Sequence, residues 1–196
     1  MNFQSIDKKI LKALRLEAKS VIQKNYGKLR SAVKPIIIDS IYDCPEMESV
    51  RSGKLKYDFG IDIDPTQLIA WTVADSMKLS YSYSQSFIFN FQISVQPLNN
   101  SNLLSLQQAY TKLENGSSVP WLEWLLTKGS GIIMFDFGVL YKEGVGRSGG
   151  AIMVQNISPF MVDPLYSGTE DDNFISRALS KNIGKIQQTA WTTLLI

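Results

Sequence analysis

Three aspartates lie close together in the segment that ends at Pro65, and they are the best candidates for metal chemistry: Asp58, Asp62 and Asp64. Two or three carboxylates could hold Mg²⁺ for the cleavage of a phosphodiester. Asp62 and Asp64 alternate with isoleucines, so a strand would direct both carboxylates to one face. An Asp before Pro65 is also a typical helix start, which requires no metal. A Mg²⁺-dependent nuclease is therefore one alternative function.

Most other catalytic chemistry is excluded by composition. The 196 residues include no histidine and one cysteine, Cys44. A Ser-His-Asp triad, a Cys-His dyad and an imidazole metal site all need histidine. One cysteine allows no internal disulfide, zinc finger or iron–sulfur cluster, and nothing near Cys44 activates its thiol, so we expect it to be buried and structural. We therefore expect no enzyme, with no catalytic, cofactor-binding or metal-binding residues.

The glycine-rich segment Gly144–Gly150 is expected to be a hairpin tip rather than a phosphate-binding loop. No Gly-Lys-Ser/Thr motif follows it, and its flanks have the pattern of strands. Seven residues exceed the usual hairpin loop of about two to five. The loop is either a plain surface loop or a contact loop that presents Arg147 and Ser148 to a partner.

Positive charge is concentrated near the N-terminus. Residues 1–34 contain nine Lys/Arg and two Asp/Glu, whereas the whole chain has 20 and 18. Four of these cations form a stripe on one helical face: Lys8, Lys12, Arg15 and Lys19. The stripe is either a solvated helix face or an arm that contacts acidic protein or nucleic acid. No apolar run approaches the length of a membrane span, and the N-terminus lacks a signal-peptide core, so we expect a reduced, cytosol-made, soluble protein without membrane contact.

Apolar periodicity predicts the elements that must position these groups. Apolar residues at helical spacing predict helices at 5–25, 28–43, 65–79, 120–126 and 170–190. Gly27 separates the first two helices, Pro35 kinks or restarts the second, and Thr169 caps the last. Alternation predicts strands at 87–96, 132–141 and 151–155, with residues 81 and 83 extending the phase of the first. Residues 44–64 look irregular, and 103–113 fit either a strand or a helix.

The chain ends in an apolar segment that includes Trp191, Leu194, Leu195 and Ile196. An apolar terminus is a liability in water. We expect it to pack on this protein or to insert into a neighbour, which makes these four residues candidates for a protein interface.

The layout resembles the head–tail connector and tail-completion (neck) proteins of tailed bacteriophages. Those proteins are small α+β chains that often begin with a long amphipathic helix, followed by an extended Thr/Ser-Gly-x-Leu stretch and a sheet. Val50–Leu55 (VRSGKL) looks like that stretch, and two further segments look like parts of phage structural proteins: Ser167–Ile175 and Trp121–Leu126. The sequence departs from the simpler members in its longer C-terminal portion and in the turn at 99–102.

The resemblance implies a ring-forming virion protein, made in the host cytoplasm and located in the neck or tail. It implies that the chain contacts other copies of itself, the connector or portal on one side and the tail tube on the other, with possible non-specific DNA contact through the basic stripe. A monomeric cytosolic adaptor remains a further alternative. The predicted fold is one α+β domain over 1–196: a mainly antiparallel sheet covered on one side by a long N-terminal helix, a middle helix and a C-terminal helix. Residues 1–45 form a helical N-terminal segment, and 169–196 form a C-terminal helix or arm.

Overall fold

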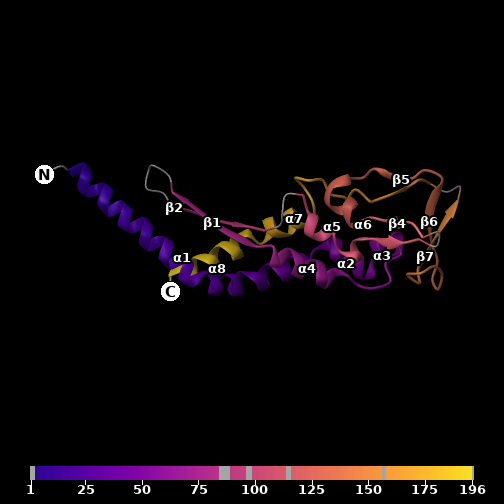
Figure 1. Cartoon of the computed structure of the whole chain (residues 1–196). Coiled ribbons are helices and arrows are strands. Elements are labelled where there is room, and N and C mark those ends of the chain that lie inside the picture. Colours follow the sequence, from indigo (N-terminus) through magenta and orange to yellow (C-terminus); the bar gives the residue numbers. More distant parts are fainter. Residues whose placement is uncertain (1–2, 84–88, 96–98, 114–115, 156–157, 196) are drawn as a thin grey trace.

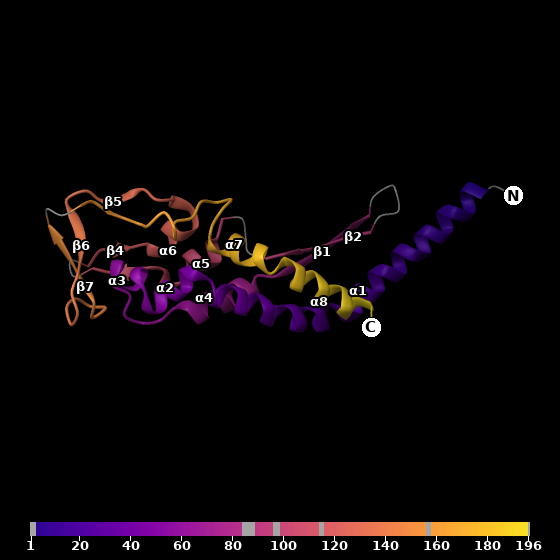
Figure 2. The same cartoon turned by 180° about the vertical axis from the view of Figure 1, so that it is seen from behind.

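The computed structural model describes residues 3–83, 89–95, 99–113, 116–155 and 158–195, with the backbone alone for residues 3–8, 81, 83, 89, 90 and 195. Helices and small antiparallel sheets follow one another along the chain, which confirms the α+β class. The molecule is elongated (Figure 1). The N-terminus lies at the tip of one long helix, and strands β6 (Phe137–Tyr141) and β7 (Ala151–Gln155) lie at the opposite end; Figure 2 shows the same arrangement from behind.

A single helix, α1 (Phe3–Tyr42), replaces the two that the sequence predicts. Neither Gly27 nor Pro35 ends it. Pro35 lies on the exposed side, and a proline inside a helix costs about 3 kcal/mol. The opposite side carries four side chains that are wholly buried in the core: Leu29, Val33, Ile37 and Ile41. Burial of each aliphatic side chain contributes roughly 1.5–3 kcal/mol, so packing outweighs the local break.

Two short helices occupy the region that the sequence predicts to be irregular. Helix α2 (Pro45–Ser52) begins with proline at its first position and has Glu46 and Glu48 in its first turn, where carboxylates favour the positive end of the helix. Gly53 separates it from α3 (Lys54–Asp58). The prediction of irregular structure is therefore wrong here, and so is the expectation, taken from the resemblance, that Val50–Leu55 is extended.

Helix α4 (Thr66–Asp75) confirms the predicted middle helix but ends earlier. Its predicted apolar face is buried, and α4 packs along α1. The chain then enters strand β1 (Lys78–Tyr83), which pairs antiparallel with β2 (Phe89–Ser94) from Lys78↔Ser94 onward. Residues 81 and 83 thus lie on the partner strand and do not lengthen the predicted strand. Along β2, half-buried Phe91 and Ile93 alternate with exposed Gln92 and Ser94, as the sequence predicts.

The middle of the chain mixes short helices and strands. The segment 103–113 contains both structures that the sequence left open: the end of α5 (Ser101–Leu104), η1 (Gln107–Ala109) and β3 (Thr111–Lys112). Strand β4 (Ser118–Val119) pairs with β3. Helix α6 (Trp121–Glu123) and the π-helix η2 (Trp124–Lys128) confirm a short helix after Pro120. The Trp121 side chain is buried, and the centre of its ring lies 6.3 Å from the centre of the Phe59 ring.

The strands described form four two-stranded sheets instead of one. The predicted strand 132–141 divides into β5 (Ile132–Met134) and β6, because each half pairs with a different segment. Strand β5 pairs with β8 (Phe160–Met161), and β6 pairs with β7 from Phe137↔Gln155 to Tyr141↔Ala151. The hairpin predicted around Gly144–Gly150 is thereby confirmed.

The C-terminal helical region begins later than predicted and is broken once. Helix α7 (Phe174–Lys181) ends at Asn182, and α8 (Ile183–Leu195) follows. The N-cap is Asn173 rather than Thr169, because the Asn173 side chain accepts hydrogen bonds from the backbone N–H groups of Ile175 (3.1 Å) and Ser176 (3.2 Å). The acidic residues 170–172 therefore precede the helix. In the described part of the chain, no helix is both long and apolar enough to cross a membrane.

Replacement of the observed cap should cost more stability than replacement of the predicted one. Asn173→Ala removes both capping bonds of a buried side chain, so we expect the free energy of unfolding to fall by about 1–2 kcal/mol. Thr169→Ala is the matched control and should cost less, since Thr169 does not cap α7. Urea denaturation of both variants measures the difference, and equal losses would contradict the assignment of the cap.

Candidate interaction surface

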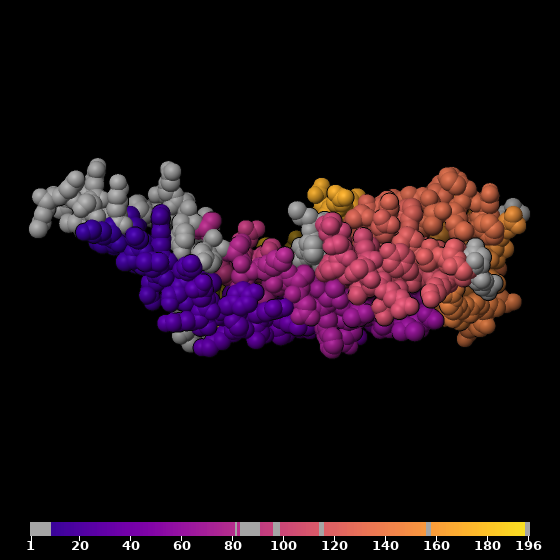
Figure 3. All heavy atoms as spheres, viewed as in Figure 1, coloured from indigo at the N-terminus to yellow at the C-terminus, as the bar shows by residue number. Residues whose placement is uncertain are grey.

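The first half of α1 extends beyond the body of the molecule (Figure 3). The first side chain of α1 that is buried, among those described, is Ile22. Helix α8 runs antiparallel to α1 and packs against it, but α1 continues past the C-terminal end of α8 (Figures 1 and 2). We call residues 3–21 of α1 the arm.

The arm has an uncovered apolar face. Its side chains at helical spacing form what we call the arm stripe: Leu11, Leu14, Ala18 and Val21. Leu14 is 60% exposed, and the other three side chains are half-buried. The spacing continues into Ile22 and Leu29, which are buried. The face that holds α1 to the body thus continues along the arm, where none of the described side chains is buried; an exposed apolar face of this kind is typical of an interaction site.

The predicted basic stripe lies beside the arm stripe. Lys12, Arg15 and Lys19 are exposed on the same helix at steps of three and four residues, which places them on one side of it. The side chain of Lys8 is outside the described residues. A single helix therefore presents an apolar face flanked by cations.

The C-terminal residues predicted to form an interface have different surroundings. Trp191 is 58% exposed, whereas Leu194 packs against the core of this chain. The side chain of Leu195 and all of Ile196 lie outside the described residues. Helix α8 is anchored by buried Ile186 and Ala190, so the terminus is partly folded onto its own chain and partly presented by Trp191.

An apolar groove separates the β1–β2 hairpin from α7 and α8. It consists of two hollows of about 380 and 480 Å³ that share Ile93, Ile183 and Ile186. Phe91 and Val95 extend the wall formed by β2. We call this the apolar groove. Sequence analysis did not find it: the apolar faces of the strand and of the last helix were each visible as patterns, but no pattern shows that the two diverge.

The loop Gly144–Gly150 is folded tightly at the end of the molecule opposite the arm. Backbone bonds from Gly144 N–H to Gly149 O and from Lys142 N–H to Gly150 O close it. Gly146 has a φ of 71°, and a Cβ there would strike the Ala151 carbonyl. Arg147 is exposed and lines a hollow together with residues 61–63 and 110–112, while the Ser148 hydroxyl is buried without a hydrogen-bond partner. The loop that carries the two predicted contact residues joins β6 to β7, and these strands lie far from the arm (Figure 1).

The three aspartates of the nuclease hypothesis do not converge. Asp58 is buried at the end of α3 and accepts a hydrogen bond from the Tyr141 hydroxyl. Asp62 is exposed and bonds to the N–H of Ile63, and Asp64 accepts from Thr66 N–H at 2.9 Å, at the start of α4. The segment is not a strand, so the geometry predicted for Asp62 and Asp64 is wrong. Within the described residues, no group of three or more Asp, Glu or Cys side chains could hold a metal ion.

The environment of Asp58 shifts its ionisation. Burial raises the pKa of Asp58 above its ordinary value, against the lowering effect of the Tyr141 hydrogen bond and of nearby Lys54. Asp163 has the opposite shift: the backbone N–H of Leu165 and the Lys54 ammonium, 2.9 Å away, lower its pKa. The pKa values of these two neighbouring carboxyl groups are therefore shifted in opposite directions.

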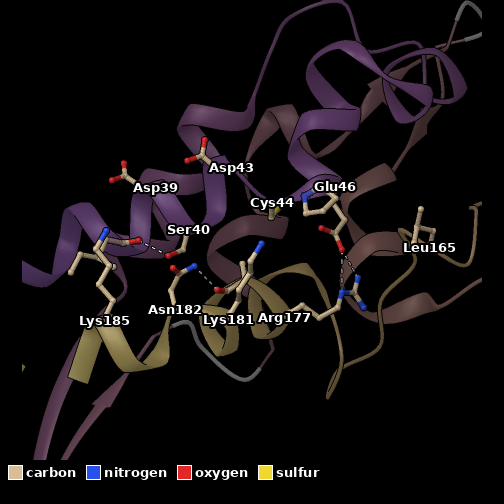
Figure 4. A pocket seen from close by; sticks show the side chains of 13 residues that line it. Asp39, Ser40, Asp43, Cys44, Glu46, Leu165, Arg177, Lys181, Asn182 and Lys185 are labelled. Carbon is tan, nitrogen blue, oxygen red and sulfur yellow. Dashed lines mark hydrogen bonds and ion pairs between the residues drawn. The ribbon is translucent and has the colours of Figure 1, made fainter. Parts of the chain in front are cut away.

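A polar pocket of about 590 Å³ lies between the end of α1 and helices α7 and α8 (Figure 4). Its best-defined interaction joins Arg177 to buried Glu46, with Nη2 at 2.7 Å and Nε at 3.1 Å from the same carboxylate oxygen. Asp39 and Asp43 lie on the α1 side and Lys181 and Lys185 on the other. Cys44 is buried beneath, as predicted, and burial raises the pKa of its thiol to about 12.

The arm stripe and the apolar groove are thus two exposed apolar surfaces. Helix α7 takes part in the groove through Ile175 and in the polar pocket through Arg177. Charged pairs such as Arg177–Glu46 are partnered within the chain and join elements distant in sequence. The chain matches no protein-family model, no curated protein and no solved structure at a significant level.

The opposite pKa shifts of Asp58 and Asp163 predict opposite pH effects on stability. With a raised pKa, the folded protein takes up the Asp58 proton before the unfolded chain does, so stability rises as pH falls from neutral toward and through that raised pKa. With a lowered pKa, Asp163 contributes stability above its unfolded value that is lost as pH falls.

Unfolding of wild type, Asp58→Asn and Asp163→Asn by urea between neutral pH and about pH 2 measures both effects, because the stability that Asp163 contributes is lost only as pH falls through its lowered pKa. Relative to Asp58→Asn, the wild type should gain stability as pH falls; relative to Asp163→Asn, it should lose stability. The same slope for both variants would contradict the different environments assigned to the two carboxyl groups.

Proposed function

We propose that this protein is a non-enzymatic structural subunit that acts through protein–protein contacts in an oligomeric assembly. The arm stripe carries the proposal: an apolar helix face that points into solvent favours association, since each leucine removed from water contributes roughly 1.5–3 kcal/mol. The exposed indole of Trp191 supports it, because tryptophan is enriched among residues that dominate binding energy.

The specific assembly that we propose is a ring in the neck or tail of a tailed bacteriophage, as a tail-completion or terminator subunit between head and tail. The resemblance of the sequence to neck proteins supports this, and so does the long amphipathic helix with which the chain begins. The helical structure of Val50–Leu55 departs from the extended stretch of those proteins. Quantification of the protein in purified particles tests the assignment: a fixed number of copies per particle is expected, and its absence from particles would contradict it.

The basic stripe suits a second role in such an assembly. Lys12, Arg15 and Lys19 could approach phosphate groups of DNA in a channel without contacting bases. This contact would be independent of DNA sequence and would weaken as the salt concentration rises.

Two leucines of the arm provide a matched test of self-association. Leu14 and Leu16 are both 60% exposed, but the arm stripe includes only Leu14. Leu14→Gln should weaken association about 10- to 100-fold, as expected when one leucine no longer leaves water. Leu16→Gln should change it little, since position 16 lies on the other side of the helix.

Sedimentation velocity over a wide range of protein concentration measures this difference, and circular dichroism checks that both variants keep the helical content of the wild type. Equal weakening by the two substitutions would show that the arm stripe does not specify the contact. A wild-type protein that stays monomeric at every concentration and is also missing from particles would contradict the proposed function.

A further inference from the structure

We propose that the arm of one copy of this chain lies in the apolar groove of the next copy. This inference rests on the proposed function, because it specifies the contact by which the subunits would assemble. It joins two of the apolar surfaces that this chain leaves uncovered, so that each subunit supplies one helix and accepts another.

The dimensions of the two surfaces agree. At the α-helical rise, residues 3–21 of the arm span about 28 Å. The helical wall of the apolar groove has two parts, Ile175–Ser180 in α7 and Ile183–Leu194 in α8, which correspond to about 8 and about 17 Å. An arm laid along the groove would therefore be covered over most of its length.

The chemistry of the groove suits an amphipathic helix. Its opposite walls are apolar side chains of a strand and of a helix pair, represented by Ile93 and Ile183. Helices recognised in grooves use apolar residues at steps of three and four, which is the spacing of Leu11, Leu14 and Ala18 in the arm. Ile183 is 55% exposed, so the groove as it stands leaves apolar surface in water.

Charge favours the same pairing. Glu170 is the one charged side chain among the described residues that line the groove, and exposed Asp171 follows it. The arm beyond residue 8 carries Lys9, Lys12, Arg15 and Lys19 against Glu17 alone. A basic helix beside an acidic groove end gains electrostatic complementarity, which directs association and fixes its orientation.

The arm that fills a groove must come from another copy. Within one chain, the arm leaves the end of α8 and extends away from the body (Figures 1 and 2). The two surfaces are different parts of the molecule, so the contact is heterologous, and repetition of such a contact closes a ring when the rotation between subunits permits. Pairing of two arms with each other is the competing arrangement and gives a symmetric dimer instead.

Disulfide cross-linking between two chains that each carry one introduced cysteine distinguishes these arrangements. All variants carry Cys44→Ala, which removes the native thiol. A 1:1 mixture of Leu14→Cys and Ile183→Cys chains, oxidised at a concentration where the wild type associates, should give at least ten times more cross-linked dimer than two control mixtures. One control replaces the first partner by Leu16→Cys on the other side of the arm. The second replaces Ile183→Cys by Lys185→Cys, which lines the polar pocket instead.

The remaining outcomes separate this inference from the proposed function. Strong cross-linking of Leu14→Cys with itself, without enrichment in the mixture, would show arm–arm pairing and overturn the groove contact alone. Association by sedimentation without enriched cross-linking in the Leu14→Cys and Ile183→Cys mixture would also overturn the groove contact while the proposed function stands. A chain that remains monomeric at every concentration, with no enriched cross-link, would overturn the groove contact; its absence from particles would then overturn the proposed function as well.

Discussion

The structure depends on helix α1, of which only the second half packs into the core of its own chain. From Leu29 to Ile41, α1 contributes fully buried side chains to the core, and helices α4, α7 and α8 all pack against it. Before Ile22, no described side chain of α1 is buried. An isolated helix of this length is marginal in water, so the arm is stabilised mainly by propagation from the packed half. A helix held in this way remains apolar on one face and gains stability from any partner that covers it.

The spacing of apolar residues was sufficient to predict an element wherever the burial of one face of that element determines its structure. The apolar residues of α4, such as Ile69 and Val73, share a face by spacing alone and are wholly buried. The same reasoning failed at Pro45 and Gly53, which break regular structure in general but here begin α2 and separate it from α3. It failed again at Pro35, because the burial of neighbouring residues outweighs the local cost.

The residues of the candidate site also fall into those that the sequence places correctly and those that it does not. Lys12, Arg15 and Lys19 were predicted to lie together, and they do, because helical geometry alone brings them to one side. The aspartates required an additional assumption, that the segment is a strand, and Asp58 instead meets Tyr141, 83 positions further along the chain. The apolar groove depends on the angle between β2 and α8, which no spacing within either element encodes.

Charged groups that find partners within the chain contrast with apolar groups that only another molecule could cover. Around α3 and α7, charged side chains find partners within the chain: Lys54 contacts Asp163, and Arg177 binds buried Glu46. Loss of Arg177 would leave the charge of buried Glu46 without compensation, whereas Lys54 and Asp163 are both partly exposed and their contact contributes less. Along the arm stripe, exposed Leu14 is apolar, and contact with water is unfavourable for such a side chain. An apolar helix face and an apolar groove can each be covered by a surface of the other kind, so one chain that carries both can cover them with further copies of itself.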